Sequence, residues 1–258
     1  MTPRSLFNKA LHMLSELRME LKTEGNLGYL QSSILQGVLM EQADKVYAET
    51  VHITGLHPYS QSVSSKNGLT WSIRTLNKDA YRGVIEPLLL PDFNGFDIKV
   101  KEQHVDILSK SLVSKSYEDL MKTFNSERTD KYIRIEFESP TAFKRDSTYV
   151  FIPDTRLIFG SLMRKYSAAS ESTDMTDEDT LQYIADYSFI SDFRIRSTRF
   201  PLEGVKIPSF MGEITIRFSG TDTMARYAKM LLEFGEFSGV GIKCGMGMGA
   251  IKIIERTT

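Results

Sequence analysis

The sequence predicts an α+β protein built from two tandem ferredoxin-like (RRM-like βαββαβ) domains. Several short segments alternate apolar and polar residues, which is typical of half-buried strands. Other segments repeat apolar residues every three or four positions, which is typical of amphipathic helices. The order strand, helix, strand, strand, helix, strand occurs twice along the 258 residues, and that order is the split βαβ arrangement.

The first domain is expected over residues 15–125, after an N-terminal extension of residues 1–14. Its first strand is expected over 15–22, because Leu17, Met19 and Leu21 alternate with charged residues. The other expected elements are helical segments over 29–43 and 44–51, a polar turn over 64–68, a strand over 69–76, a helix over 80–90 capped by 77–79, and strands over 96–101 and 105–112.

The polar stretch 116–128 holds at most one short helix and marks the expected domain boundary. The second domain is expected over residues 126–258. Its expected elements are a strand over 131–138, a helix over 157–169, an acidic loop over 171–179 that caps a helix over 177–187, strands over 190–200 and 212–218 joined by a connection over 201–208, a helix starting at 221, and a last strand over 250–255.

Composition is that of a soluble globular protein, with 41% hydrophobic and 25% charged residues. No apolar run approaches the ~20 residues of a membrane span, and the N-terminus lacks the apolar core of a signal peptide. The single cysteine, Cys244, excludes an internal disulfide and fits a cytoplasmic location. Since the net charge is −1, binding to RNA would need a local basic surface.

Glycines are concentrated near the C-terminus. Six of the fifteen residues from Gly235 to Gly249 are glycine, against 17 in the whole chain. Apolar residues fill the gaps, which favours a packed loop over a flexible linker, and the exposed amides of such a loop would suit phosphate. A dinucleotide-binding loop is disfavoured, because that loop follows a strand and opens a helix, whereas this one follows a helix and precedes a strand.

The segment Phe237-Ser-Gly-Val-Gly-Ile-Lys-Cys-Gly-Met-Gly-Met-Gly249 resembles the glycine-rich motif of the CRISPR repeat-processing endoribonucleases, a family of the RAMP superfamily. The segments 139–145, 151–154 and 157–162 resemble the start of that family's second domain. The segment 33–40 resembles its first helix, and Val51-His52 followed by Pro58-Tyr59 resembles its active-site segment.

The resemblance implies two ferredoxin-like domains and cleavage of CRISPR repeat RNA (pre-crRNA) into guide RNAs. The family needs no metal and no cofactor: the ribose 2′-OH attacks the adjacent phosphate and leaves a 2′,3′-cyclic phosphate and a 5′-OH. Other CRISPR effector subunits and a second copy of the chain are further partners that the resemblance leaves open. A non-catalytic RAMP subunit that holds guide RNA shares the fold and is the alternative function.

Such a reaction needs a base, an acid and positive charge near the phosphate. Histidine suits the first two roles, because its ordinary pKa of ~6.5 lies near working pH. Of the four histidines, His52 and His57 lie where the resemblance places catalysis, and His52 is favoured. The alternative is that one of the two only caps the helix or bonds the loop backbone. Tyr29, just before the first helix, is the candidate tyrosine.

The RNA-binding surface is expected on the second domain. Arg194 and Arg196 are two positions apart on an expected strand and so share a face. The full set of expected RNA-binding residues is Lys144, Arg145, Arg194, Arg196, Arg199, Gly239, Gly241, Lys243, Gly245 and Gly247. Metal catalysis is disfavoured, because the sequence has neither His-Glu-x-x-His nor Cys-x-x-Cys.

Overall fold

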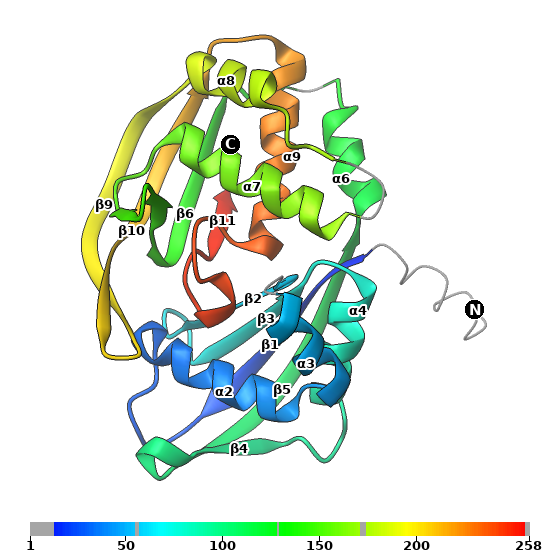
Figure 1. Ribbon diagram of the computed structural model, residues 1–258, viewed down its shortest axis with the longest axis vertical. Helices are drawn as coiled ribbons and strands as arrows, with labels where there is room; N and C mark the ends of the chain where they lie inside the picture. The colour runs from blue at the N-terminus through cyan, green and yellow to red at the C-terminus, as the bar shows by residue number, and fades with distance from the viewer. Residues whose placement is uncertain (1–12, 55–56, 128, 171–173, 256–258) are drawn as a thin grey trace, which may run out of the picture. The chain divides into compact units, whose positions relative to one another are not determined.

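The computed structural model describes residues 13–54, 57–127, 129–170 and 174–255 (Figure 1). The chain forms two compact units. The first comprises the chain up to Tyr117 together with Cys244–Gly247, and the second comprises Glu118–Lys243 together with the residues from Met248 on. Most of the expected N-terminal extension, His12 included, lies outside the described residues.

The first unit contains a five-stranded antiparallel sheet with the strand order β2-β3-β1-β5-β4. Alternation in β1 puts Leu17, Met19 and Leu21 into the core beside Trp71 and Ile73 of β3. The strands are β1 (Met13–Lys22), β2 (Tyr59–Ser64), β3 (Thr70–Thr75), β4 (Gly95–Ile98) and β5 (Gln103–Ser116).

Helices cover the core side of this sheet. The Asn77 side chain accepts a hydrogen bond from the Ala80 amide and caps the helical segment that begins at Lys78, as the sequence predicts. The helical elements of the unit are η2 (Tyr29–Gln31), α2 (Ser32–Gln42), α3 (Lys45–Thr54), α4 (Lys78–Ala80), the π-helix η3 (Tyr81–Ile85), α5 (Glu86–Leu88), and the 3-10 turns η4 (Lys99–Lys101) and η5 (Cys244–Met246).

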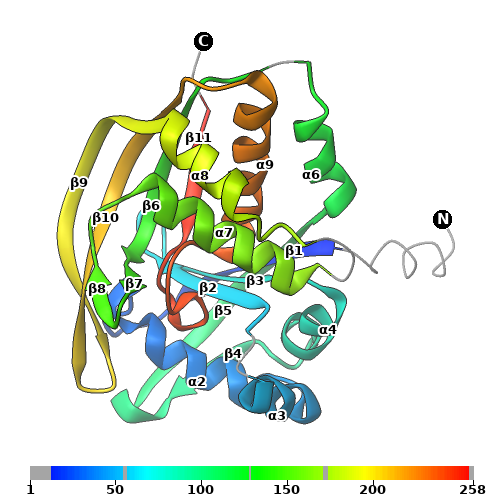
Figure 2. The ribbon, with the colours of Figure 1, turned by 45° about the horizontal axis from the view of Figure 1, so that its top comes forward.

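The second unit contains a four-stranded antiparallel sheet with the order β11-β6-β10-β9. Its strands are β6 (Tyr132–Thr141), β9 (Ser188–Leu202), β10 (Val205–Phe218) and β11 (Ile251–Ile254), and β7 (Phe143–Arg145) pairs with β8 (Thr148–Val150) in a separate hairpin. Three helices, α7 (Thr155–Ala169), α8 (Glu178–Tyr187) and α9 (Asp222–Ser238), cover one face of the large sheet (Figure 2).

Capping residues explain where these three helices begin. The side chains of Asp154, Asp177 and Thr221 each accept a hydrogen bond from a backbone amide in the first turn. Both units follow one spatial rule. When the strands of each large sheet are numbered in chain order, with the edge strand β4 left out, they lie side by side as fourth, first, third, second. The predicted tandem ferredoxin-like fold is confirmed.

Two strand predictions were wrong. The connection expected over 201–208 is part of one long hairpin, in which Pro201 pairs with Lys206 and Pro208 with Arg199. The chain reverses at Glu203 and Gly204, with φ of 48° and 81°, the left-handed pair of a type I′ turn. Strand β2 was not predicted at all, because its sequence is polar although Ser60 and Gln61 are buried.

The short helix α6 (Tyr117–Phe124) was expected at the end of the first domain, but from Glu118 on it belongs to the second unit. Thr123 Oγ1 donates to the Glu233 carboxylate of α9 at 3.0 Å, and Arg226 Nε donates to the Phe124 carbonyl at 3.1 Å. The first unit ends at Tyr117, whereas the sequence placed the end of the first domain at residue 125. Across the described part of the chain, no helix combines the length and apolar character needed to cross a membrane.

Candidate functional site

His57 lies between α3 and β2 and is exposed. Its ring stands edge-on to the ring of Tyr59, with the centroids 5.9 Å apart and the planes at 88°. Tyr59 is 3% exposed, and its hydroxyl bonds the Gln36 side chain of α2 and lies 4.0 Å from Met40 Sδ. Burial raises the pKa of Tyr59, so its hydroxyl is protonated at neutral pH. A fixed, neutral ring therefore supports the exposed imidazole.

His52 and Tyr29 lie in the same unit as His57. His52 belongs to the last turn of α3, which runs three residues beyond the expected helix end at residue 51. Tyr29 opens η2 directly before α2, and its carbonyl accepts a hydrogen bond of 2.7 Å from Ser32 Oγ. The described ring contact of His57 comes from Tyr59, which the sequence analysis did not choose. Only the adjacent Pro58-Tyr59 pattern could have indicated it.

His104 is engaged elsewhere in the first unit. It lies on β5, and its Nδ1 is 2.6 Å from the carboxylate of Asp97 on β4, while Nε2 is 3.5 Å from Asp106. The hydrogen bond to Asp97 is the main cause that raises the pKa of His104. This arrangement is a surface ion pair across two strands.

Most amides of the glycine stretch bond within the protein. In the second unit, the Gly241 amide donates to Ser161 Oγ at 2.9 Å, the Ile242 amide to the Ala142 carbonyl at 3.0 Å, and the Gly249 amide to the Pro140 carbonyl at 3.0 Å. The amides of Gly239 and Gly247 are also bonded within the protein. These amides donate within the protein, and the RNA-binding role expected for Gly239, Gly241, Gly245 and Gly247 stays a prediction.

Close packing explains why this stretch holds glycine at several positions. Gly241 has φ of +80°, and a Cβ atom there would lie 2.3 Å from the Ala142 carbonyl oxygen. Lys165 of α7, which the sequence analysis missed, donates through Nζ to the carbonyls of Gly239 at 2.9 Å and Ser238 at 3.3 Å. Lys165 therefore holds the C-terminal end of α9 in place. Its positive charge is favourable there because the C-terminus of a helix carries a partial negative charge.

The residues Cys244–Gly247 pack within the first unit. Gln61 of β2 donates from Nε2 to the Gly245 carbonyl at 3.0 Å and to the Ser32 carbonyl at 3.2 Å. A Cβ atom at Gly245 would lie 3.2 Å from the Tyr59 ring, and one at Gly247 would lie 2.1 Å from Ser32 Oγ. Gly245 thus lies directly against Tyr59, the support of His57, and Gly247 lies against Ser32.

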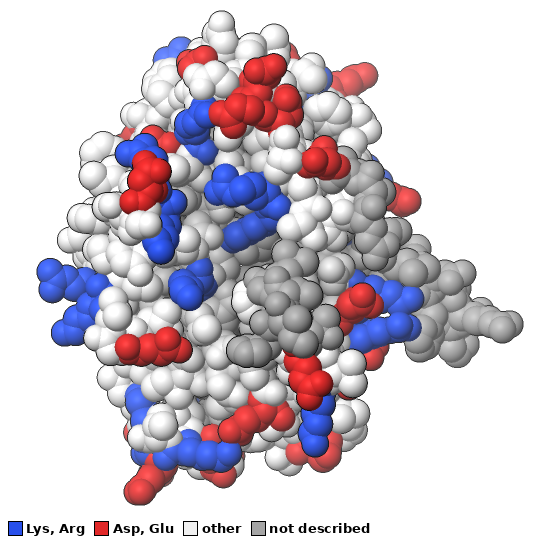
Figure 3. Space-filling view, in the orientation of Figure 1, with Lys and Arg blue, Asp and Glu red and all other residues white. Residues whose placement is uncertain are grey.

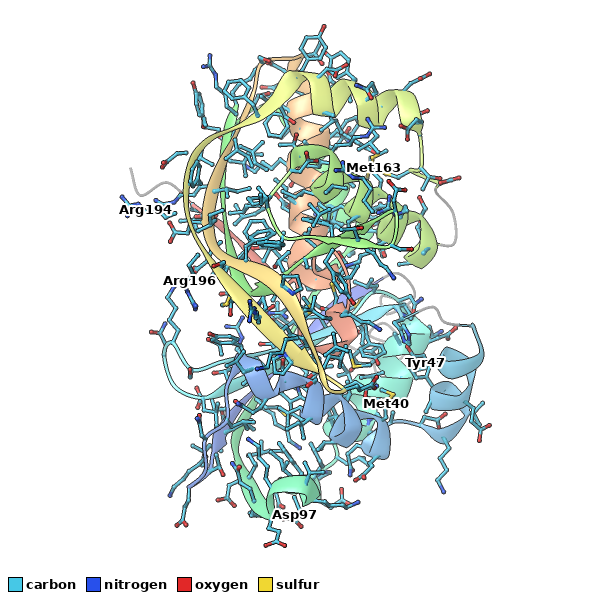
Figure 4. The ribbon with its side chains drawn as sticks, turned by 60° about the vertical axis from the view of Figure 1, so that its left-hand side comes forward. Met40, Tyr47, Asp97, Met163, Arg194 and Arg196 are labelled. Carbon is cyan, nitrogen blue, oxygen red and sulfur yellow. The ribbon has the colours of Figure 1, made fainter. Side chains whose placement is uncertain are left out.

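The basic residues expected to bind RNA are exposed in the second unit: Lys144 and Arg145 on β7, Arg194, Arg196 and Arg199 on β9, and Lys243 in the glycine stretch. Figure 4 shows Arg194 and Arg196 pointing to the same side of the β9 ribbon. Figure 3 shows Lys and Arg side chains on the face that carries α7, with acidic side chains gathered over α8. The acidic side chains lie on the same face as these basic ones, and Arg156 of α7 pairs with Glu178 of α8.

Sequence comparison decides the family. The model of the CRISPR-associated endoribonuclease Cas6 matches residues 135–251. A Cas6 endoribonuclease of Streptococcus thermophilus is 37% identical over 227 residues, covering 85% of this chain and 90% of that protein. One from Mycobacterium tuberculosis is 36% identical over 221 residues, covering 85% of this chain and 70% of that protein. The chain belongs to the Cas6 family of CRISPR-associated endoribonucleases.

Solved Cas6 structures share the fold of this Cas6 chain. A Cas6 product complex superposes with a TM-score of 0.78 at 20% identity, over 94% of this chain and 100% of that one. Thermus thermophilus Cas6 gives a TM-score of 0.72 at 22% identity, over 95% and 100%. A RAMP protein described as binding different RNA substrates gives 0.56 at 16% identity.

The described residues of this Cas6 protein offer no group of three or more His, Cys, Asp or Glu side chains that could hold a metal ion. What they offer for chemistry is an imidazole supported by a buried tyrosine in one unit and exposed guanidinium and ammonium groups in the other. An imidazole can take or give a proton, and the cations can neutralise phosphate charge.

Proposed function

We propose that this Cas6 endoribonuclease cleaves CRISPR repeat RNA to release guide RNAs, by a metal-independent transesterification. A base removes the proton of a ribose 2′-OH, and the 2′-oxygen attacks the adjacent phosphorus. The bond from phosphorus to the 5′-oxygen breaks, and an acid protonates that oxygen. The products are a 2′,3′-cyclic phosphate and a 5′-OH.

The observation that carries this proposal is the exposed His57 ring against the buried Tyr59. The edge-on contact restrains the plane of the imidazole, and an imidazole can take and give protons near neutral pH. His52, in the last turn of α3, is the second candidate for the proton transfer, and Tyr29 is the candidate that positions an RNA oxygen.

RNA binding is assigned to the exposed basic side chains of the second unit. Arg194, Arg196 and Arg199 follow one another along β9, and Lys144 and Arg145 stand on the β7–β8 hairpin. Guanidinium groups form paired hydrogen bonds with phosphate oxygens, which suits contacts along an RNA backbone. In the glycine stretch, the exposed side chain of Lys243 contributes the contact, while Gly239, Gly241, Gly245 and Gly247 shape the loop.

Three reactions test the chemistry: one with repeat RNA, one with the same RNA in excess EDTA, and one with an RNA that has a single 2′-deoxy sugar at the cleavage site. Cleavage at one position in both of the first two, ending in a cyclic phosphate, is the expected result. The deoxy substrate should bind and stay intact. Cleavage of the deoxy substrate, or loss of cleavage in EDTA that Mg²⁺ restores, would overturn the mechanism.

Single-residue variants test which histidine takes part in cleavage. Replacing the catalytic histidine should slow single-turnover cleavage ~10²-fold or more while leaving RNA binding nearly unchanged. His52→Ala and His57→Ala are compared with His104→Ala, whose side chain is held by Asp97 and should matter little. If both His52→Ala and His57→Ala cut at the normal rate, the site assignment is wrong.

The alternative function, a RAMP subunit that binds guide RNA without cutting it, fits the fold equally well. The curated relatives are named endoribonucleases, which favours the nuclease. Tight binding of repeat RNA with no cleavage of any substrate would favour the subunit.

A further inference from the structure

The face of the second sheet that is opposite the helices carries an arginine between two aromatic rings. The guanidinium carbon of Arg217 on β10 lies 5.4 Å from the ring centroid of Tyr132 on β6 and 5.5 Å from that of Phe189 on β9. These are cation–π distances. Tyr132 is 40% exposed and Phe189 is 45% exposed, so the rings are open to solvent.

Strand register places the three side chains in one row. Arg217 pairs directly with Tyr132 on one side and with Phe189 on the other. Their neighbours in the strands, such as Ile133 and Ile216, point into the core. Because adjacent strands are ~4.8 Å apart, the row spans about 10 Å across the sheet. We call Tyr132, Arg217 and Phe189 the aromatic row.

We propose that the aromatic row is a stacking site for unpaired bases of single-stranded RNA, separate from the residues assigned to cleavage. Unstacked bases bind on aromatic rings and on guanidinium planes, and a four-stranded sheet with exposed aromatics is a recurrent platform for this contact. The row offers both kinds of surface side by side, already held in place by the cation–π contacts. The proposal rests on the proposed function only in that it takes RNA as the ligand.

The charges around the aromatic row indicate that RNA binds there by stacking and not by net charge. The next rows along the sheet hold cations (Arg134, Arg194, Lys252) and anions (Glu136, Asp192, Glu213) in register, and Arg134 pairs with Glu213. A surface of mixed sign releases few counterions when RNA binds. Binding at the row should therefore depend only weakly on salt, unlike binding to a basic groove.

The test uses the full chain and short unstructured RNA oligonucleotides that carry one 2-aminopurine, a base whose fluorescence falls when it stacks. With wild-type protein we expect quenching on binding. The variant Tyr132→Ala/Phe189→Ala should lose the quenching and bind about fivefold or more weakly. Tyr132→Phe should behave as wild type, because it keeps the ring. Loss of binding in that variant too would overturn the stacking role.

Phe193→Ala is the matched control. Phe193 lies on β9, the strand of Phe189, and is 64% exposed. It pairs with the buried Ile214, so its side chain lies on the face of the sheet opposite to the aromatic row. It should bind and quench as wild type does. The proposal is overturned if the double variant retains full binding and quenching, or if Phe193→Ala loses as much.

A second copy of the chain is the rival occupant of the row. If the wild type is a dimer in solution, the double variant a monomer, and both bind RNA equally, the row is a protein interface and the proposal fails. Cleavage assays distinguish a failure of this proposal from a failure of the proposed function. The double variant should still cut repeat RNA at the same position. If the wild type fails to cut, the proposed function is overturned, but the binding and quenching measurements still test whether RNA stacks on the aromatic row.

Discussion

Gln61 of β2 donates a hydrogen bond of 3.0 Å from its side-chain amide to the carbonyl of Gly245. Two residues distant in the sequence are thus joined inside the first unit. The same amide donates to the Ser32 carbonyl, and the Gln61 side-chain carbonyl accepts from Trp71 Nε1 at 2.6 Å. One fully buried glutamine therefore ties the start of α2, a core tryptophan and the glycine stretch together.

Replacing Gln61 with leucine should destabilise the protein strongly. The change keeps the volume but leaves the Trp71 N–H and two backbone carbonyls without their partner, at ~1–3 kcal/mol for each buried group left unsatisfied. We expect a loss of about 3 kcal/mol, measured by urea unfolding. Gln42→Ala, at an exposed site on α2, is the control and should stay within ~0.5 kcal/mol of wild type.

Gly247→Ala tests whether close packing explains the glycine stretch. A Cβ atom at this position would meet Ser32 Oγ at 2.1 Å, and the backbone has φ of +104°. Gly68→Ala is the matched control, because Gly68 has φ of +94° but nothing within 4 Å. We expect Gly68→Ala to cost ~1 kcal/mol, for backbone strain alone, and Gly247→Ala to cost ~2–4 kcal/mol. Equal losses would show that packing adds nothing there.

The fold could be predicted from the sequence because Asp154, Asp177 and Thr221 mark the helix starts of the second unit. The interior strands β1 and β6 also alternate clearly between buried and more exposed residues. The prediction failed at β2, where buried polar residues replace the apolar pattern and bond to other elements, as Ser62 does to Arg74 of β3. Gln61 is the clearest example: a glutamine is ordinarily a surface residue, and only its three tertiary partners make it part of the core.

The candidate site was predictable only in part. The family resemblance pointed to the loop that carries His57, but the contact with Tyr59 depends on a strand that was not predicted. The glycine stretch was expected to present its amides to phosphate. Its amides instead bond to Ser161 and to carbonyls far back in the chain, such as those of Pro140 and Ala142, and no local pattern reports such partners.

Alkaline pH should destabilise the second unit through Tyr227. Burial, with smaller effects of Tyr166 and Asp177, raises the pKa of Tyr227 from 10.0 to about 12. Below the ordinary value both folded and unfolded states keep the proton, so the contribution to stability is complete. As pH rises from 10.0 to about 12 the unfolded state loses its proton first, and stability falls.

The measurement is the urea midpoint at a series of pH values. Tyr227→Phe should lose stability less steeply than wild type in that window, while the difference between the two proteins should stay constant at neutral pH. If the urea midpoints of wild type and Tyr227→Phe fall in parallel across the alkaline range, the loss of stability does not come from Tyr227.

Lys165 should be needed to hold the glycine stretch. Its ammonium group donates to the carbonyls of Ser238 and Gly239, which end α9. Lys165→Met keeps the aliphatic stem but leaves both carbonyls without their charged donor, so we expect a loss of ~2 kcal/mol in urea unfolding. Arg164→Met, at the exposed neighbouring position of α7, removes the same charge and should cost less than ~0.5 kcal/mol. If the two variants lose stability equally, the loss reflects the charge of α7, and Lys165 does not anchor the end of α9.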